Sequence, residues 1–426
     1  MFTKMVRFIA LLTVAVMALG MLAACGEPES SGGGSLPGSS GGSAPTPTSA
    51  PSGGGTSGDA TPSGGGQAAG DVVKVGVILP LTGPSANTGE DALNGVKMAV
   101  EEANASGELP VTIELVIDDD RSTPSEGVSA VQKQITSDGV SAVLGPFNSN
   151  VSLAVRDVTF ENKIPQLTLG AAADSLTEGE SAEYLWRAHM YNKLQANQFA
   201  SYITDVLGAK KVAILVENTD YGIGLRDFWV PHFEQAGTEI VANETYNPSD
   251  TDFLGILTKI KNADPDFIVL EALVTQAGII LKQADSLGID MTKFVGIGGL
   301  DQNELPELAD GAQDGVKFML WFSPQANEQA AQFAEAYQAK YNKEANSFAA
   351  QGYTVATVLI EAIKKAGSGD PAKIQEALPS VEFDSPIGHI QFGADHNATA
   401  SIFMAEWQGT EKVLLEEQPE QPKPAS

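Results

Sequence analysis

The sequence predicts an α/β protein with two lobes, each a parallel sheet that carries helices on both faces. Nearly continuous apolar runs alternate with segments whose apolar residues recur at helical spacing. The alternation occurs in two series, from residue 72 to about 170 and from residue 210 to about 299. Strands buried on both faces have this pattern, and two series indicate two doubly wound sheets.

The first series begins with the apolar run VVKVGVILP and a helical pattern from Gly89 to about Ala105. The apolar residues of that pattern fall on one face of a helix. The series continues with the strand VTIELVIDDD, a helix near 125–137, the strand VSAVLG, a helix near 150–161 and the strand IPQLTLG.

The second series is built in the same way. Its predicted elements are KKVAILVEN, a helix near 223–236, TEIVAN, a helix near 252–262, DFIVLEAL, a helix near 276–287 and FVGIGG. Beyond Phe322 we expect helices over about 328–367 and 371–378, and then the short strands GHIQF and SIFMAEW, which return to the lobes. Two such lobes favour a cleft that captures a small ligand.

The N-terminus has the features of a secretory signal peptide, which we place at residues 1–24. Lys4 and Arg7 precede an apolar stretch from Phe8 to Ala24 that contains no acidic residue. The stretch ends in LAAC, which resembles the lipobox of bacterial lipoproteins, so we expect cleavage before Cys25 and a diacylglycerol on its thiol. An uncleaved anchor is the alternative, but the stretch lies at the short limit for a membrane span.

A long low-complexity segment follows the only cysteine of the chain. Residues 25–70 are mostly Gly, Ser, Pro and Thr without an aromatic residue, so they cannot bury a core and are expected to form a disordered tether. The ligand-binding domain is expected over residues 71–415, with a flexible tail at 416–426.

Composition and motifs exclude several functions. The formal charge, 25 − 54 = −29, repels nucleic acid. The pair Gly222 and Gly224 lacks the third glycine of a dinucleotide fingerprint, and no G-x-S-x-G nucleophile elbow occurs. The four histidines show no short metal-ligand spacing, and the run Asp118–Asp120 before Pro124 more often caps a helix than binds a cation. We expect no cofactor, no metal and no catalysis.

Residues 72 to about 408 resemble the branched-chain amino-acid binding proteins, whose type I periplasmic-binding fold serves ABC importers. The resemblance rests on the order and spacing of GVILPLTGPSANTGEDALNGVKMAVEEANASG, IDDDRSTPSEGV, GPFNSNVSLAV, IPQLTLGAAADSLT, NTDYGIG, ADPDFIVLEAL and GHIQFGADH.

The resemblance implies three crossovers between the lobes. Lobe one would comprise residues 72–189 and 323–383, and lobe two residues 190–322 and 384–415. The protein would be a monomer, anchored by lipid to the outer face of the cell membrane or to a periplasm-facing membrane. It would deliver its ligand to ABC permease and ATPase subunits. A ligand sensor for a membrane partner and an extracytoplasmic enzyme are the alternatives.

The resemblance also implies where the ligand binds. Ser149, in GPFNSN, matches the serine whose hydroxyl binds the ligand carboxylate, and Asn148 could add an amide donor. Ala171 falls where a backbone group contacts the ligand, whereas Ala172 replaces the usual hydroxyl residue. Tyr221, in NTDYG, matches the tyrosine contributed by lobe two.

The loop LPLTGPSANTGED lies between the first strand and the first helix. It ends in Gly-Glu-Asp where a phosphate-binding loop needs Gly-Lys-Ser or Gly-Lys-Thr. The resemblance implies that this loop borders the cleft and faces a carboxylate or carbonyl, with Thr88 where an aromatic residue is common. Alternatively, its glycines only shape a strand-to-helix turn.

Two further positions depart from the family pattern. Leu273 stands where an aromatic residue is frequent, and Gly298 stands where an acidic residue pairs with the ligand ammonium. A buried ammonium without a counter-charge is penalised by several kcal/mol. Glu271 and Asp301 are nearby substitutes, or else both are solvated loop carboxylates. The ligand is then an amino acid held by a displaced acid, or a less polar carboxylate or amide.

Overall fold

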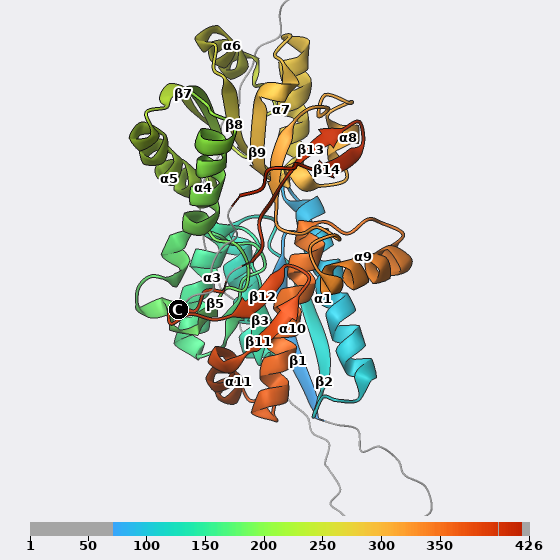
Figure 1. The fold of residues 1–426 in the computed structure, drawn as a ribbon. Coiled ribbons are helices and arrows are strands. Elements are labelled where there is room, and N and C mark those ends of the chain that lie inside the picture. The colour runs from blue at the N-terminus through green and yellow to red at the C-terminus, as the bar shows by residue number, and fades with distance from the viewer. Residues whose placement is uncertain (1–70, 399, 420–426) are drawn as a thin grey trace, which may run out of the picture. The chain divides into compact units, whose positions relative to one another are not determined.

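The computed structural model describes residues 71–398 and 400–419, and two separate sheets organise them (Figure 1). Sheet one has five parallel strands in the order β2-β1-β3-β4-β5. They are β1 (Val72–Leu79), β2 (Thr112–Asp119), β3 (Ala142–Leu144), β4 (Gln166–Leu167) and β5 (Leu185–Trp186).

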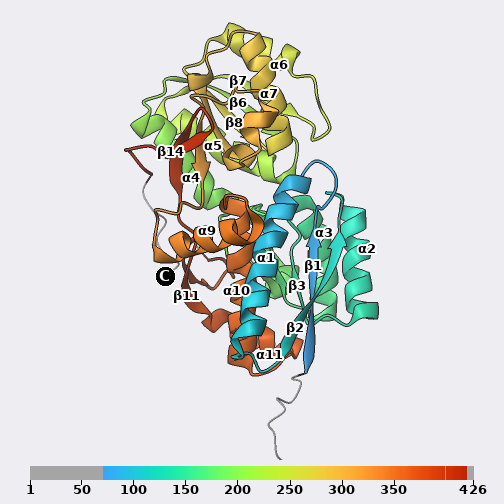
Figure 2. The same cartoon turned by 90° about the vertical axis from the view of Figure 1, so that its right-hand side faces the viewer.

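Helices cover both faces of sheet one. Figure 2 shows α1 and α10 side by side, and α2 and α3 also pack on each other. The helices associated with this sheet are α1 (Ala86–Ser106), α2 (Pro124–Lys133), which continues as a π-helical turn over Gln134–Asp138, α3 (Ser149–Asn162), α9 (Glu328–Tyr341), α10 (Ser347–Ala366) and α11 (Pro371–Ala377).

Sheet two has seven strands in the order β14-β13-β10-β9-β8-β6-β7. They are β6 (Lys211–Glu217), β7 (Glu239–Tyr246), β8 (Phe267–Ala272), β9 (Phe294–Gly298), β10 (Lys317–Leu320), β13 (Phe403–Gln408) and β14 (Glu411–Leu414). Its helices are α4 (Asn192–Ser201), α5 (Asp220–Ala236), α6 (Leu254–Ala263), α7 (Val274–Ser286) and α8 (Leu305–Leu308). The predicted doubly wound α/β class is confirmed, although β13 and β14 form an antiparallel edge.

Side chains alternate between two buried faces along the central strands. In β1, Val75 and Val77 belong to the core beneath α1 and α10, whereas Ile78 belongs to the core beneath α2 and α3 together with Val131 and Val155. Successive side chains of a strand point to opposite faces, so helices on both sides make the whole strand apolar. This explains the run VVKVGVILP.

The chain passes between the sheets three times, from β5 to α4, from β10 to α9, and from the hairpin β11 (Glu382–Ser385) and β12 (Gly388–Gln391) to β13. Arg187 joins the first and third passages. Its Nε donates to Asn397 Oδ1 at 2.7 Å, and its carbonyl accepts from the Ala398 N–H at 2.8 Å. These two connections therefore lie side by side.

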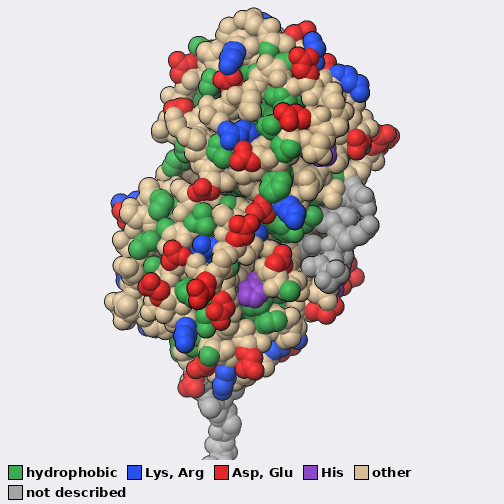
Figure 3. Space-filling model, turned by 90° about the vertical axis from the view of Figure 1, so that its left-hand side faces the viewer, with side chains coloured by type: hydrophobic (Ala, Val, Ile, Leu, Met, Phe, Trp, Pro, Cys, Tyr) green, Lys and Arg blue, Asp and Glu red, His purple; other side chains and the backbone are tan. Residues whose placement is uncertain are grey.

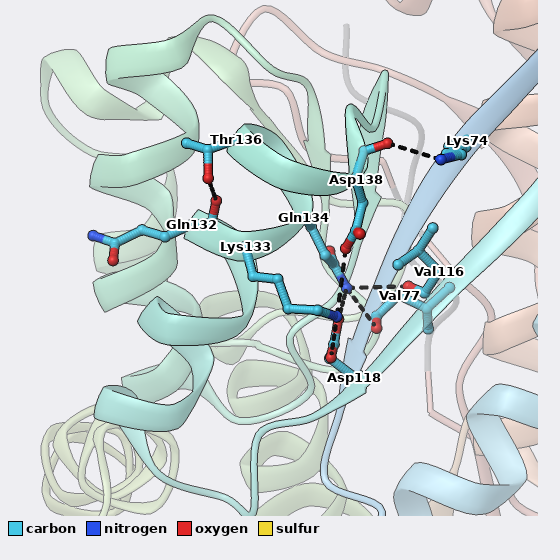
Figure 4. Close-up of polar contacts among 9 residues, drawn as sticks. All are labelled: Lys74, Val77, Val116, Asp118, Gln132, Lys133, Gln134, Thr136 and Asp138. Carbon is cyan, nitrogen blue, oxygen red and sulfur yellow. Dashed lines mark hydrogen bonds and ion pairs between the residues drawn. The ribbon is translucent and has the colours of Figure 1, made fainter. Parts of the chain in front are cut away.

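Gln134 ties the π-helical turn to sheet one. Its side-chain amide donates to the carbonyls of Val77 and Val116, and to Asp118 Oδ2 at 3.0 Å (Figure 4). Lys133 also pairs with Asp118, at 2.9 Å. The Asp118 carboxylate, the first of the Asp118–Asp120 run, therefore binds Gln134 and Lys133 within the fold.

The exterior agrees with the acidic composition. Figure 3 shows acidic side chains scattered over one face, with fewer lysines and arginines between them. In the stretches 71–398 and 400–419 we find no helix with both the length and the apolarity that a membrane span requires. The predicted signal peptide, tether and lipidated Cys25 lie outside the described residues. Gln418, in the predicted tail, hydrogen-bonds to the backbone of Met404.

Candidate ligand-binding site

A small cavity lies where the carboxyl ends of strands from both sheets meet. Its volume is about 40 Å³, which is room for a few water molecules. Ligands bind at such strand ends in open α/β sheets. The lining residues are Phe147, Asn148, Ser149, Asn150, Gly170, Glu217, Thr219, Tyr221, Leu273, Gly298, Trp321 and Phe348.

The sheet-one side of the cavity presents hydrogen-bond donors. Ser149 is the first residue of α3, and its buried hydroxyl accepts from the N–H groups of Ala172 and Ala173 at 3.1 and 3.2 Å. Asn148 precedes the helix and donates from Nδ2 to Ser85 Oγ at 3.1 Å. The partial positive charge of the α3 N-terminus and the hydrogen that the Ser149 hydroxyl can still donate favour an anionic group such as a carboxylate.

Aromatic side chains form an apolar wall. The ring of Phe348 meets those of Phe147 and Trp321 edge to face, with centroids 5.4 and 5.5 Å away. Leu273, which follows β8, also lines the cavity. An apolar ligand side chain can be buried here, because such rings offer a large desolvated contact area.

Tyr221 reaches the cavity from the first turn of α5. The side chain of Thr219 caps this helix by accepting from the Gly222 N–H at 3.2 Å. The Tyr221 hydroxyl accepts from Gln195 Nε2 at 3.3 Å. Burial raises the pKa of Tyr221 well above its usual value, so the phenol is neutral and available as a donor.

Two acidic side chains meet at the sheet-two side of the cavity. Glu217 ends β6, Glu271 lies on the adjacent β8, and Glu271 Oε2 accepts from the Glu217 N–H at 2.8 Å. Their exposed fractions are 4% and 0%, and neither Oε1 has a protein hydrogen-bond partner within the described chain. Two carboxyl groups are thus buried together without a cation.

The environment favours the protonated form of both carboxyl groups. Burial raises the pKa of Glu217 to about 7. Burial and then the neighbouring charge of Glu217 raise the pKa of Glu271 well above its usual range. The sequence prediction included Glu271 but missed Glu217, whose signal was an acidic residue at the carboxyl end of the strand that leads into NTDYG.

Two glycines near the carboxyl pair have little room for a side chain. Gly298 has a φ of +96°, and a Cβ there would lie 2.7 Å from the carbonyl oxygen of Ala272, so a glutamate would strain the backbone. At Gly222, by contrast, a Cβ would lie 2.5 Å from Glu271 Oε2. The missing side chain of Gly222 makes room for the carboxyl group of Glu271.

Asp301 does not line this cavity. Its buried Oδ2 accepts from the Ser347 N–H at 3.2 Å, and the Lys412 Nζ donates to its backbone carbonyl at 2.9 Å. Asp301 lines a larger hollow of about 660 Å³ between β14 and α9, to which neither Ser149 nor Tyr221 contributes. In the smaller cavity, by contrast, Ser149, the aromatic wall and Glu217 all contribute to the lining.

Thr88 also lies outside the cavity lining, and it joins the lobes instead. Its Oγ1 accepts from Gln302 Nε2 at 2.9 Å, and both side chains are buried. Nearby, Lys343 bridges Asp91 of α1 and Glu304, each at 2.6 Å. The predicted residues Ala171 and Ala172 are buried beside Ser149, where the Ala172 N–H bonds to its hydroxyl.

The acidic run Asp118–Asp120 at the end of β2 accepts hydrogen bonds from the surrounding chain. Asp119 accepts from the N–H groups of Leu81 and Thr82, and Asp120 Oδ1 accepts from the Ser122 N–H. Within residues 71–398 and 400–419 no group of three or more His, Cys, Asp or Glu side chains is arranged to hold a metal ion.

Comparisons with known proteins agree with this architecture. The family model described as periplasmic binding protein matches residues 72–412. A Leu/Ile/Val-binding protein homologue of Brucella abortus is 32% identical over 342 residues, which cover 79% of this chain and 90% of that protein.

Two solved structures share the fold. The branched-chain amino acid transporter substrate-binding protein of Streptococcus pneumoniae, in complex with isoleucine, is 31% identical, with a TM-score of 0.76 and coverage of 83% of this chain and all of that one (100%). A solute-binding protein of an ABC transporter from R. palustris, in complex with benzoate, is 26% identical, with a TM-score of 0.76 and coverage of 83% and 98%. The chain belongs to the periplasmic binding protein family.

Proposed function

We propose that this protein is a lipid-anchored receptor that binds a small amino-acid-like ligand and delivers it to an ABC importer. The ligand is a branched-chain amino acid or a related carboxylate or amide. The cavity carries the proposal, because Ser149 and the α3 N-terminus offer an anion site beside an apolar wall. The isoleucine and benzoate bound by two relatives both combine a carboxylate with an apolar group.

Closure of the lobes around the ligand is the mechanism that we propose. Ser149 belongs to lobe one, which contains sheet one, and Tyr221 belongs to lobe two, which contains sheet two. A ligand that contacts both stabilises the closed arrangement and shifts the population toward it. The three connections between the sheets would act as the hinge.

A calorimetric panel tests the ligand class. Leucine, isoleucine, valine and phenylalanine are titrated, each with its keto acid and its amide, and benzoate is included. We expect saturable one-to-one binding of at least one carboxylate and no chemical conversion of any compound over hours of incubation. Formation of a product would support the enzyme alternative, and binding of none of the compounds would contradict the proposed ligand class.

The lipid anchor has a separate test. Cys25→Ser removes the thiol that would carry the diacylglycerol, so the chain should accumulate as an unprocessed precursor without an acyl mass. Ser30→Ala, in the predicted tether, is the control and should be processed normally. Mass spectrometry of the membrane fraction distinguishes the forms, and a Cys25→Ser chain that is cleaved before residue 25 and acylated would refute the lipobox interpretation.

A further inference from the structure

A buried carboxyl pair adjoins the cavity: Glu217 lines it, and Glu271 packs behind Glu217. We propose that Glu217 and Glu271 both carry protons in the empty site at mildly acidic pH, and that an ammonium-bearing ligand displaces one of these protons into solvent when it binds. The inference rests on the proposed function and names the ligand more narrowly, as a compound with both a carboxylate and an ammonium group.

The two carboxyl groups have different roles in this geometry. Glu217 lines the cavity and its Oε1 has no protein hydrogen-bond partner among the described residues, so it faces the ligand. Glu271 lies behind it, beneath Gly222, and is held by the hydrogen bond from the Glu217 N–H. Two carboxyl groups this close cannot both ionise in a buried site, so Glu271 keeps its proton and Glu217 exchanges one.

The elements around the pair supply no compensating charge. Tyr221 of α5 and Tyr246 of β7 are the titratable groups that face it, and the Tyr246 hydroxyl donates to the Glu271 backbone carbonyl at 3.1 Å. Burial raises the pKa of both phenols, so both are neutral. The negative charge of Asp301 contributes to the raised pKa of Tyr221. No Lys, Arg or His of the described chain lowers the pKa of either glutamate.

An ionised Glu217 therefore needs a cation from the ligand. A buried carboxylate without a partner is penalised by several kcal/mol, whereas a protonated one is neutral and can donate a hydrogen bond. Ser149 and Glu217 line the same small cavity from the two lobes, so a ligand whose carboxylate binds near Ser149 can place the ammonium on its adjacent α-carbon toward Glu217. An ammonium on this carbon favours the ionised form of Glu217, and the carbonyl of a keto acid at the same carbon favours the protonated form.

These two ligand types have opposite pH dependences. Because burial raises the pKa of Glu217 to about 7, binding of an ammonium ligand below that pH must release a proton. Release of one proton weakens affinity about tenfold per pH unit as the pH falls. Affinity for the keto acid should stay constant or increase as the pH falls over the same range.

Calorimetry from about pH 5.5 to about pH 8.5, in buffers with different ionisation enthalpies, measures both the affinity and the released proton. The probes are leucine, isoleucine, valine and phenylalanine, each with its own keto acid. We expect release of about one proton per amino acid at the acidic end and none at about pH 8.5. Amino-acid binding that is independent of pH and releases no proton would overturn the proton exchange while leaving the proposed function intact.

Glu217→Gln keeps the shape of the side chain and removes its titration. We expect this variant to lose the pH dependence and to bind the amino acid roughly thirtyfold more weakly, or worse, at about pH 8. Glu239→Gln, at the exposed first residue of β7, is the matched control and should behave as the wild type. Retention of the pH dependence in Glu217→Gln would refute the assignment to this residue.

Infrared difference spectroscopy of the unmodified protein gives an independent readout. Addition of the amino acid at about pH 6 should remove one protonated-carboxyl band, and addition of the keto acid should not. An unchanged carboxyl band on saturation with the amino acid would overturn the proposal. Failure of every probe to bind would overturn the ligand class itself, and the proton exchange with it.

Discussion

Ser149→Ala should reduce both folding stability and ligand affinity, because one hydroxyl group serves both. In the empty site its oxygen accepts from the N–H groups of Ala172 and Ala173, and all three residues are at most 4% exposed. Each buried donor left without a partner costs about 1–3 kcal/mol, and water entering the cavity recovers part of that. We expect the free energy of unfolding to fall by about 2 kcal/mol, measured by urea denaturation without ligand.

The effect of Ser149→Ala on binding is a separate quantity. A hydrogen bond to a charged group contributes about 1.5–3 kcal/mol, so the loss of the contact with the ligand carboxylate should weaken binding about 10- to 150-fold. Calorimetry with the tightest ligand of the panel measures this change on folded protein. Affinity equal to that of the wild type would refute the assignment of the carboxylate to this helix terminus.

Ser152→Ala is the matched control on the same helix. Ser152 is also fully buried, but its hydroxyl accepts from Gln166 Nε2 at 3.0 Å and does not line the cavity. Its loss leaves one buried donor unpaired, so stability should fall by about 1–2 kcal/mol while affinity stays within about twofold. An equal loss of affinity in both variants would show that Ser149 acts only through the fold.

Gly222→Ala should destabilise the protein by about 1–3 kcal/mol and impair binding, because the added methyl group collides with Glu271 and the Glu217 backbone. Gly255→Ala places its methyl group in open space on α6, so it should stabilise the protein by up to about 1 kcal/mol. Thermal unfolding of both variants checks the opposite signs, and equal shifts would contradict this account. Gln302→Ala removes the hydrogen bond to Thr88 between the lobes, so affinity should fall about fivefold and small-angle scattering at saturating ligand should show a more open protein. Unchanged compaction would show that this contact does not stabilise the closed lobes.

Hydrophobic periodicity predicted most elements of the fold, because strands such as β1 and β6 are apolar on both faces. It missed α4, which buries the polar side chains Asn192 and Gln195 together with Phe199, so the helix shows little apolar periodicity. It also missed the two-residue strand β5, which is too short for a pattern. The antiparallel edge depends on which strands become neighbours, and periodicity does not encode that.

Residues of local motifs could be assigned to a common site from the sequence. Ser149, Tyr221, Leu273 and Gly298, identified from short segments far apart in the chain, line one cavity in the structure. The aromatic wall was not identified, because residues such as Trp321 resemble ordinary core residues until the order of the strands is known. Glu217 was missed because its closeness to Glu271 depends on β6 and β8 being neighbours in the sheet.

A crystal structure of the complex with the tightest-binding amino acid tests the central claim most directly. We predict a closed cavity in which the ligand carboxylate lies about 2.7–3.2 Å from Ser149 Oγ or a neighbouring backbone N–H, and the ammonium lies within the same distance of a Glu217 carboxylate oxygen. The apolar side chain should pack against Phe147 and Trp321. A ligand bound in the hollow beside Asp301, or one whose ammonium has no contact with Glu217, would contradict the account.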